Sequence, residues 1–86
     1  MKTYVVFRDN TEYARTVTDY MRDFERFTGK KLDTIDPDSR QGSSFCATYD
    51  IVEYPTLIAV DNTGIMQNTW RGLPLPTINE VSYYVS

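Results

Sequence analysis

The chain has 86 residues, 41% of them hydrophobic and 24% charged, which favours one small globular domain over a disordered or fibrous protein. A net charge of −3 without a cluster of Lys and Arg argues against a nucleic-acid partner, and the absence of histidine removes His-based catalysis and His-containing metal sites. Residues 57–60, the longest apolar run, are far too short to span a membrane, and no signal peptide precedes the first strand, so a cytoplasmic protein is expected.

The first two predicted elements are a buried strand and an amphipathic helix. The run Tyr4-Val5-Val6-Phe7 is typical of a strand buried on both faces, which is expected over residues 3–9. Over residues 11–28, apolar side chains recur every three or four positions and so form one stripe of a helix. We expect Asp9 or Asn10 to cap this helix and Gly29 to end it.

A second strand and a second helix follow. The strand is expected over residues 31–36, because Pro37 cannot continue a ladder. Asp38 or Ser39 can begin the helix, but Gly42 and the two serines after it are unfavourable in a helix interior. The regular part of this helix is therefore expected only over residues 43–49.

The second half predicts a hairpin and a terminal helix. Strands are expected over residues 56–61 and 65–71, joined by the turn Asn62-Thr63-Gly64, and a helix with Val81 and Val85 on its buried face follows Pro76. The order β-α-β-α-β-β-α predicts an α/β fold. A right-handed crossover joins parallel strands and the hairpin adds an antiparallel edge, giving a four-stranded mixed sheet with helices on both faces.

Particular residues of the second half form a recognisable set. They are Ile35-Asp36 at the end of a core strand, Tyr49-x-Ile51 before Pro55-Thr56-Leu57, and the glycines Gly64 and Gly72 around the last strand. At these residues the second half resembles thioredoxin, whereas the first half resembles it only in pattern. The family's extra N-terminal strand and helix are absent, as in its glutaredoxin-like members. The resemblance implies a minimal thioredoxin-like fold over residues 1–86, with the family's cis-proline at Pro55.

The sulfur chemistry of that family is missing. Thiol–disulfide exchange uses a low-pKa cysteine at the start of the first helix and a second one three positions on, but residues 9–16 contain no cysteine. Cys46 falls at a helical position where the family has a small buried residue, so a structural role is favoured; a lone redox- or peroxide-responsive thiol is the alternative. We expect no cofactor and no metal site, since Asp33, Asp36 and Asp38 are typical of solvated loop charges.

The resemblance implies a groove where the first helix begins, where the proline turn lies and where the last strand ends. An exposed backbone beside such a proline can pair with an extended peptide. We therefore expect a redox-inactive monomer or weak homodimer that binds a protein or extended peptide; alternatives are a purely structural Pro55 and a subunit of a homo-oligomer. The groove residues predicted are Asn10, Thr11, Glu12, Tyr13, Tyr54, Pro55, Thr56, Arg71, Gly72 and Leu73.

Overall fold

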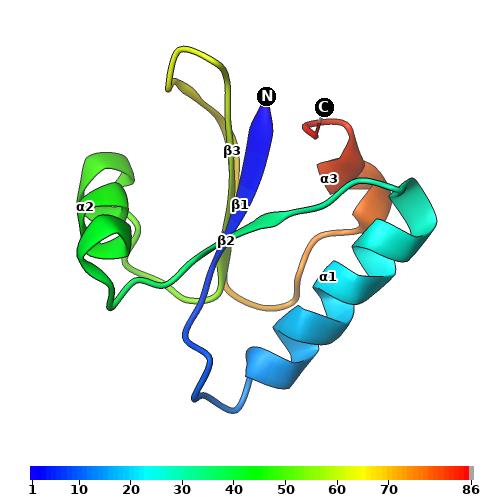
Figure 1. Cartoon of the computed structure of the whole chain (residues 1–86), viewed down its shortest axis with the longest axis horizontal. Helices are drawn as coiled ribbons and strands as arrows, with labels where there is room; N and C mark the ends of the chain where they lie inside the picture. The colour runs from blue at the N-terminus through cyan, green and yellow to red at the C-terminus, as the bar shows by residue number, and fades with distance from the viewer. Residues whose placement is uncertain (86) are drawn as a thin grey trace.

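The computed structural model describes residues 1–85 and contains the predicted elements in the predicted order (Figure 1). Most differ from prediction only at their ends. Their bounds are β1 Lys2–Val6, α1 Ala14–Thr28, β2 Asp33–Ile35, α2 Arg40–Tyr49, β3 Thr56–Val60, β4 Met66–Arg71 and α3 Ile78–Ser82.

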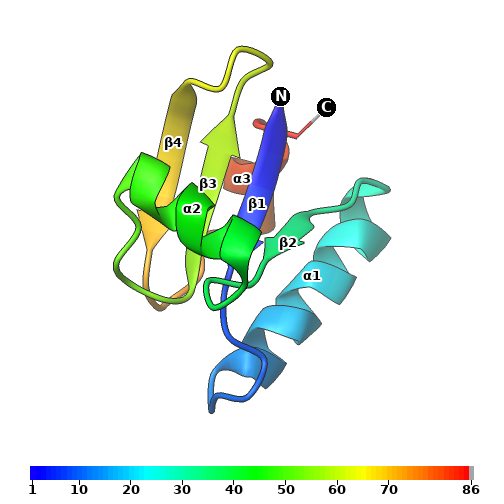
Figure 2. The same cartoon turned by 60° about the vertical axis from the view of Figure 1, so that its left-hand side comes forward.

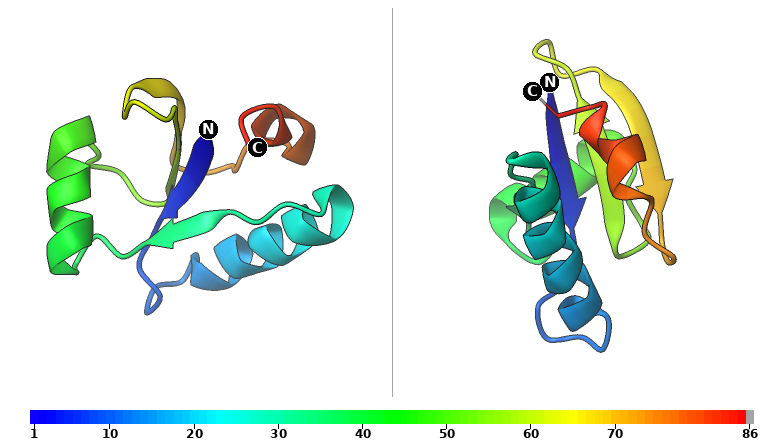
Figure 3. Two further views of the ribbon diagram at one scale, coloured as in Figure 1. Left: turned by 45° about the horizontal axis from the view of Figure 1, so that its top comes forward. Right: turned by 90° about the vertical axis from the view of Figure 1, so that its right-hand side faces the viewer.

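The four strands form one mixed sheet in the order β2-β1-β3-β4. β1 and β2 are parallel, while β3 is antiparallel to both β1 and β4. Seen edge-on in Figure 1, the sheet has α1 and α3 on one face and α2 on the other. The right-hand view of Figure 3 looks onto the face that α1 and α3 cover. The prediction of a four-stranded mixed sheet with helices on both faces is confirmed.

Apolar side chains alternate between the two faces of the sheet and form one core on each side. β3 is buried at all five residues, as expected of a central strand between two helical layers. The larger core, under α1 and α3, contains Val5, Phe7, Val17, Phe24, Leu32, Leu57, Val81 and Val85. The smaller core, under α2, contains Val6, Cys46, Ile51, Ile58 and Val60.

The expected start and cap of the first helix were wrong. α1 begins at Ala14, and the residue before it, Tyr13, makes no capping hydrogen bond with its side chain. Residues 9–13 form turns instead, in which Thr11 donates its hydroxyl to the Arg8 carbonyl at 2.7 Å and accepts the Ala14 N–H at its own carbonyl at 3.2 Å. These local bonds compete with helix formation. The end at Gly29, with φ 71°, agrees with the prediction.

The second helix is longer than expected, because Gly42 has a packing role. Ser39 caps α2 by accepting the Gly42 N–H at 2.9 Å. Gly42 is buried, and a Cβ there would overlap the Asp36 carbonyl. The low helix propensity of glycine is therefore offset by a close approach between the loop after β2 and the first turn of α2, which no other residue permits.

The remaining differences concern strand ends and the C-terminal segment. β1 ends at Val6 rather than residue 9, opposite Thr56 at the start of β3, and β2 keeps only three of six expected residues. α3 ends at Ser82, so Val85 reaches the larger core from beyond the helix. Within residues 1–85, no helix is long and apolar enough to cross a membrane.

Candidate functional site

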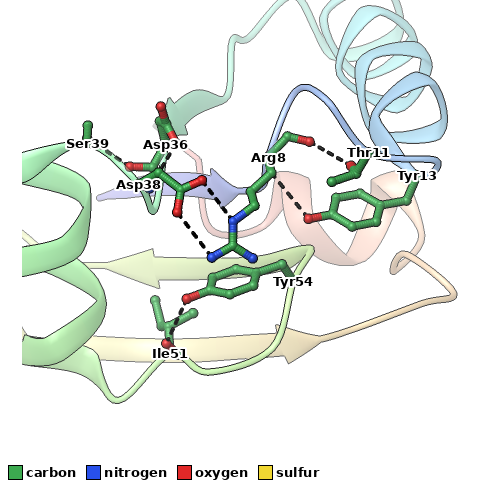
Figure 4. A network of polar contacts seen from close by, with 8 residues as sticks. All are labelled: Arg8, Thr11, Tyr13, Asp36, Asp38, Ser39, Ile51 and Tyr54. Atoms are coloured by element: carbon green, nitrogen blue, oxygen red, sulfur yellow. Dashed lines mark hydrogen bonds and ion pairs between the residues drawn. The ribbon is translucent and has the colours of Figure 1, made fainter.

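Arg8, which follows β1, lies at the centre of a network that joins three separate segments (Figure 4). Its guanidinium donates to both carboxylate oxygens of Asp38, from Nε at 2.9 Å and from Nη2 at 3.2 Å. The same guanidinium lies over the Tyr54 ring, 4.6 Å from the ring centroid. The two hydrogen bonds to the carboxylate and the stacking on the aromatic ring together fix the orientation of the Arg8 side chain. The hydrogen bond that Arg8 donates to the Asp38 carboxylate raises the pKa of Arg8, which therefore stays charged.

The start of α1 is joined to Arg8 through Tyr13. The Tyr13 hydroxyl accepts the Arg8 backbone N–H at 3.3 Å, as Figure 4 shows, and the Tyr13 ring packs against the larger core. Tyr13 is only half-buried, but its hydroxyl is already used inside the chain. Arg8 thus connects the turn before α1 with the proline turn.

Tyr54 joins this network to Cys46 on α2. Its hydroxyl donates to the Ile51 carbonyl at 3.5 Å and contacts the Cys46 thiol. Burial raises the pKa of the Cys46 thiol, while the hydrogen bond with Tyr54 and the charge of Arg8 lower it in part. Burial also raises the pKa of Tyr54, with Arg8 acting in the opposite direction. Cys46 is 7% exposed and is thus poorly placed to meet an oxidant or a disulfide.

The proline turn is attached to the end of β4. The Tyr54–Pro55 peptide bond is cis, and the Pro55 carbonyl accepts the Gly72 N–H at 2.8 Å. Gly72 has φ 72°, and a Cβ there would lie 2.9 Å from the Glu53 carboxylate. Glycine is suited to this position for both reasons, since it adopts the left-handed conformation and leaves room for Glu53.

The predicted groove residues differ in what they expose. Pro55 and Thr56 are buried, and the Thr56 hydroxyl donates to the Glu53 carbonyl at 2.7 Å, so these two residues shape the turn from inside. Thr56 also pairs with Arg71 in the β3–β4 ladder. Thr11, Tyr13, Tyr54 and Gly72 are half-buried, while the exposed members are Asn10, Glu12, Arg71 and Leu73.

Arg8, Asp38 and Val52 were not among the residues predicted for the groove. Arg8 was interpreted only as the end of a strand, and Asp38 only as a helix start or loop charge. Their contact spans 30 positions, and no local pattern could reveal it. Val52, which is 78% exposed, had a usable signal: an apolar residue two positions before the turn residue Tyr54.

The candidate site combines a charged pair with an aromatic ring. Among residues 1–85, no group of three or more His, Cys, Asp or Glu side chains could hold a metal ion. The charged pair at the centre is exposed, with 39% of the Arg8 side chain and 61% of that of Asp38 accessible to solvent. Such a pair contributes more to orientation than to stability.

Comparison with known proteins identifies the fold. No protein-family model and no curated protein matches this sequence. Among solved structures, thioredoxin 1 from the thermophilic eubacterium Thermosipho africanus is 17% identical at a TM-score of 0.66, covering 98% of this chain and 89% of that chain. Thioredoxin O2 from Arabidopsis thaliana, in its oxidized state, is 11% identical at a TM-score of 0.69, covering 95% and 69%.

A malarial protein is also similar, at 15% identity and a TM-score of 0.66, with 95% of this chain and 89% of that chain covered. At such identities these likenesses establish architecture alone. The chain has a thioredoxin-like fold, and its single cysteine excludes a CxxC motif within the sequence.

Proposed function

We propose that this thioredoxin-like domain binds another protein by pairing with an extended segment at the proline turn, without redox chemistry. The supporting observation is the Tyr54 backbone. Among the described residues, neither its N–H nor its C=O has a hydrogen-bond partner, although the neighbouring Pro55 carbonyl is paired with Gly72. Unpaired backbone groups at a surface turn are the groups that strand addition uses.

The side chains around this backbone suit a binding surface. Val52 and Leu73, on the segments joined by the bond from Gly72 to Pro55, are 78% and 55% exposed. The stack of Arg8 on Tyr54 lies two positions along the chain from Val52. Exposed apolar residues next to an arginine and an aromatic ring are typical of the centres of protein interfaces. The hydroxyl groups of Tyr13 and Tyr54 already form hydrogen bonds within the chain. The contacts proposed for the partner are therefore backbone pairing and apolar packing.

Recognition accounts for these features better than thiol chemistry does. The chain has no second cysteine, and Cys46 is buried with a raised pKa. A nucleophilic thiol needs exposure and a lowered pKa, and this one has neither. Cys46 is proposed to support the turn from below through its contact with Tyr54.

The test is a selection of peptides from a random displayed library on the intact chain, followed by calorimetry with the selected peptide. We expect Tyr54→Ala and Leu73→Ala to weaken binding about tenfold or more, as central interface residues do. Phe27→Ala is the matched control, since Phe27 is an exposed apolar residue on α1, 72% accessible and outside the proposed groove. It should bind as the unaltered protein does.

Two results would contradict the proposal. Equal losses for Phe27→Ala and Leu73→Ala would show nonspecific apolar binding. Loss of binding in a folded Cys46→Ser variant, together with a covalent adduct to the unaltered protein, would favour a thiol function.

A further inference from the structure

None of the residues that the structure describes pairs with the outer edge of β2. β2 is the terminal strand of the sheet and lies beside α1, as Figure 2 shows. The Ile35 carbonyl accepts the Phe7 N–H at 3.2 Å, so the backbone groups of Ile35 point toward the chain of β1. Successive residues of a strand direct these groups to opposite sides, and those of Thr34 therefore point outward. No described residue forms a hydrogen bond with them.

Two surface cavities lie along this edge, between β2 and α1. The larger, of about 560 Å³, is lined by Met21, Leu32 and Thr34 together with charged residues of α1. The smaller, of about 270 Å³, continues toward Asp36. Met21 and Thr34 line both cavities, which therefore form one surface, named here the α1–β2 trough. It shares no residue with the proposed groove at the proline turn.

The trough is long enough for a short strand. It extends along α1 from Thr18, in the smaller cavity, to Arg26, in the larger. A helix rises about 1.5 Å per residue, so this length is about 12 Å. An extended chain advances about 3.3 Å per residue, so about four steps, which link five residues, fit beside the edge.

The two ends of the trough carry opposite charge. Its end near the start of β2 has Arg22, Arg26 and Lys31 against the single carboxylate of Glu25. Its other end has Asp9 and Asp36. The positive end is a local exception in a chain of net charge −3.

The cations at the positive end differ in how far they are already neutralised. Arg22 and Arg26 each contact Asp23, at 3.9 and 2.7 Å. Lys31 is exposed and has no ion-pair partner among residues 1–85. Lys31 is thus the cation that an incoming carboxylate meets first.

We propose that the α1–β2 trough binds an extended peptide segment as a fifth strand, antiparallel to β2, with a basic residue opposite Asp36 and a carboxylate opposite Leu32, next to Lys31. The Thr34 N–H and C=O supply the backbone pairing, and Met21 receives an apolar side chain from the middle of the segment. Antiparallel pairing is the more stable arrangement per residue. In an antiparallel segment the N-terminal end lies near Asp36 and the C-terminal end near Lys31. The charges of the trough therefore require a basic residue at the N-terminal end of the segment and an acidic residue at its C-terminal end.

The probe is the capped peptide acetyl-Lys-Thr-Val-Thr-Glu-amide, titrated into the full chain labelled with ¹⁵N. Its control is the same composition in reverse order, acetyl-Glu-Thr-Val-Thr-Lys-amide. We expect the first peptide to bind about 3- to 10-fold more tightly, the ratio that one or two exposed ion pairs supply. Binding should slow hydrogen exchange at the Thr34 amide. Equal binding of the two peptides, or no binding of either, would overturn the proposal.

Two variants separate backbone pairing from charge. Thr34→Pro removes an outward N–H, a change that edge strands tolerate, and should abolish binding while leaving the fold intact. Lys31→Gln should erase the preference between the two peptides, whereas Lys2→Gln, at another exposed lysine, should preserve it. Persistent preference in Lys31→Gln would overturn the charge assignment even if Thr34→Pro failed to fold. A dimer in light scattering that Thr34→Pro dissociates would also overturn it, because the occupant would then be a second copy of the chain.

Discussion

The two faces of the sheet are covered unequally, and the smaller core contacts the candidate site through Tyr54. The face under α1 and α3 holds Phe24, the largest fully buried side chain, within a wide apolar core. The face under α2 holds a smaller core in which Cys46 contacts Tyr54, whose ring supports Arg8. We therefore expect changes under α1 mainly to unfold the protein, and changes under α2 to reach the candidate site as well.

Removing Phe24 should give the largest effect. Phe24→Ala leaves a cavity at a fully buried position and should lower the free energy of unfolding by about 3–5 kcal/mol in urea denaturation. Phe27→Ala, three positions on in the same helix and 72% exposed, should change it by no more than about 0.5 kcal/mol. Similar losses in the two variants would contradict the assignment of the main core to this face.

Crowding the start of α2 should have a smaller effect. Gly42→Ala places a methyl group against the Asp36 carbonyl, so the helix or the loop must shift, at a cost of about 1–3 kcal/mol. The shift should also move the NMR signals of Arg8, because Asp38 lies in the same loop. Ser43→Ala is the control on the exposed surface of α2 and should have almost no effect. A neutral or stabilising Gly42→Ala would refute the close approach.

Replacing Tyr20, on α1, should stabilise the protein, unlike the two changes above. Its hydroxyl is shielded from solvent and has no hydrogen-bond partner among residues 1–85. Tyr20→Phe removes this unpaired group and should stabilise the protein by about 1 kcal/mol at pH 7.

The same variant should alter the response to alkali. Burial, with a smaller contribution from Glu80, raises the pKa of Tyr20 to about 12 from the 10.0 expected of an unburied tyrosine. Between these values the folded state holds a proton that the unfolded state loses, so stability falls as pH rises. Tyr20→Phe should lose less stability than the unaltered protein from pH 10 to 12; equal losses would contradict this prediction.

Replacing Arg8 should have the smallest effect on the free energy of unfolding, because the side chains of Arg8 and its partner Asp38 are both exposed to solvent. Its charge lowers the pKa of Tyr54, so Arg8→Gln should raise that pKa in an NMR titration. Arg8→Lys keeps the charge and should leave the pKa nearer its original value. An unchanged Tyr54 pKa in Arg8→Gln would show that the two side chains are not in contact in solution.

Local sequence patterns were sufficient to predict most of the fold, but they predicted little of the candidate site. The stripe of apolar residues on α1 and the hairpin around Gly64 are periodic or compositional signals, and both elements appear where expected. The start of α1 was missed because the Thr11 bonds favour turns over a helix. Gly42 was misjudged because helix propensity describes an isolated helix and contains no information about the Asp36 carbonyl beside it.

The sequence by itself determined the order of elements, the proline turn and the absence of a second cysteine, because each is readable within a short window of the chain. Only the tertiary structure decided that Arg8 lies on Tyr54 and that Thr34 leaves an unpaired edge beside Met21. These contacts join positions far apart in the chain. They depend on how the sheet and helices pack, and packing is set by the whole set of buried side chains together.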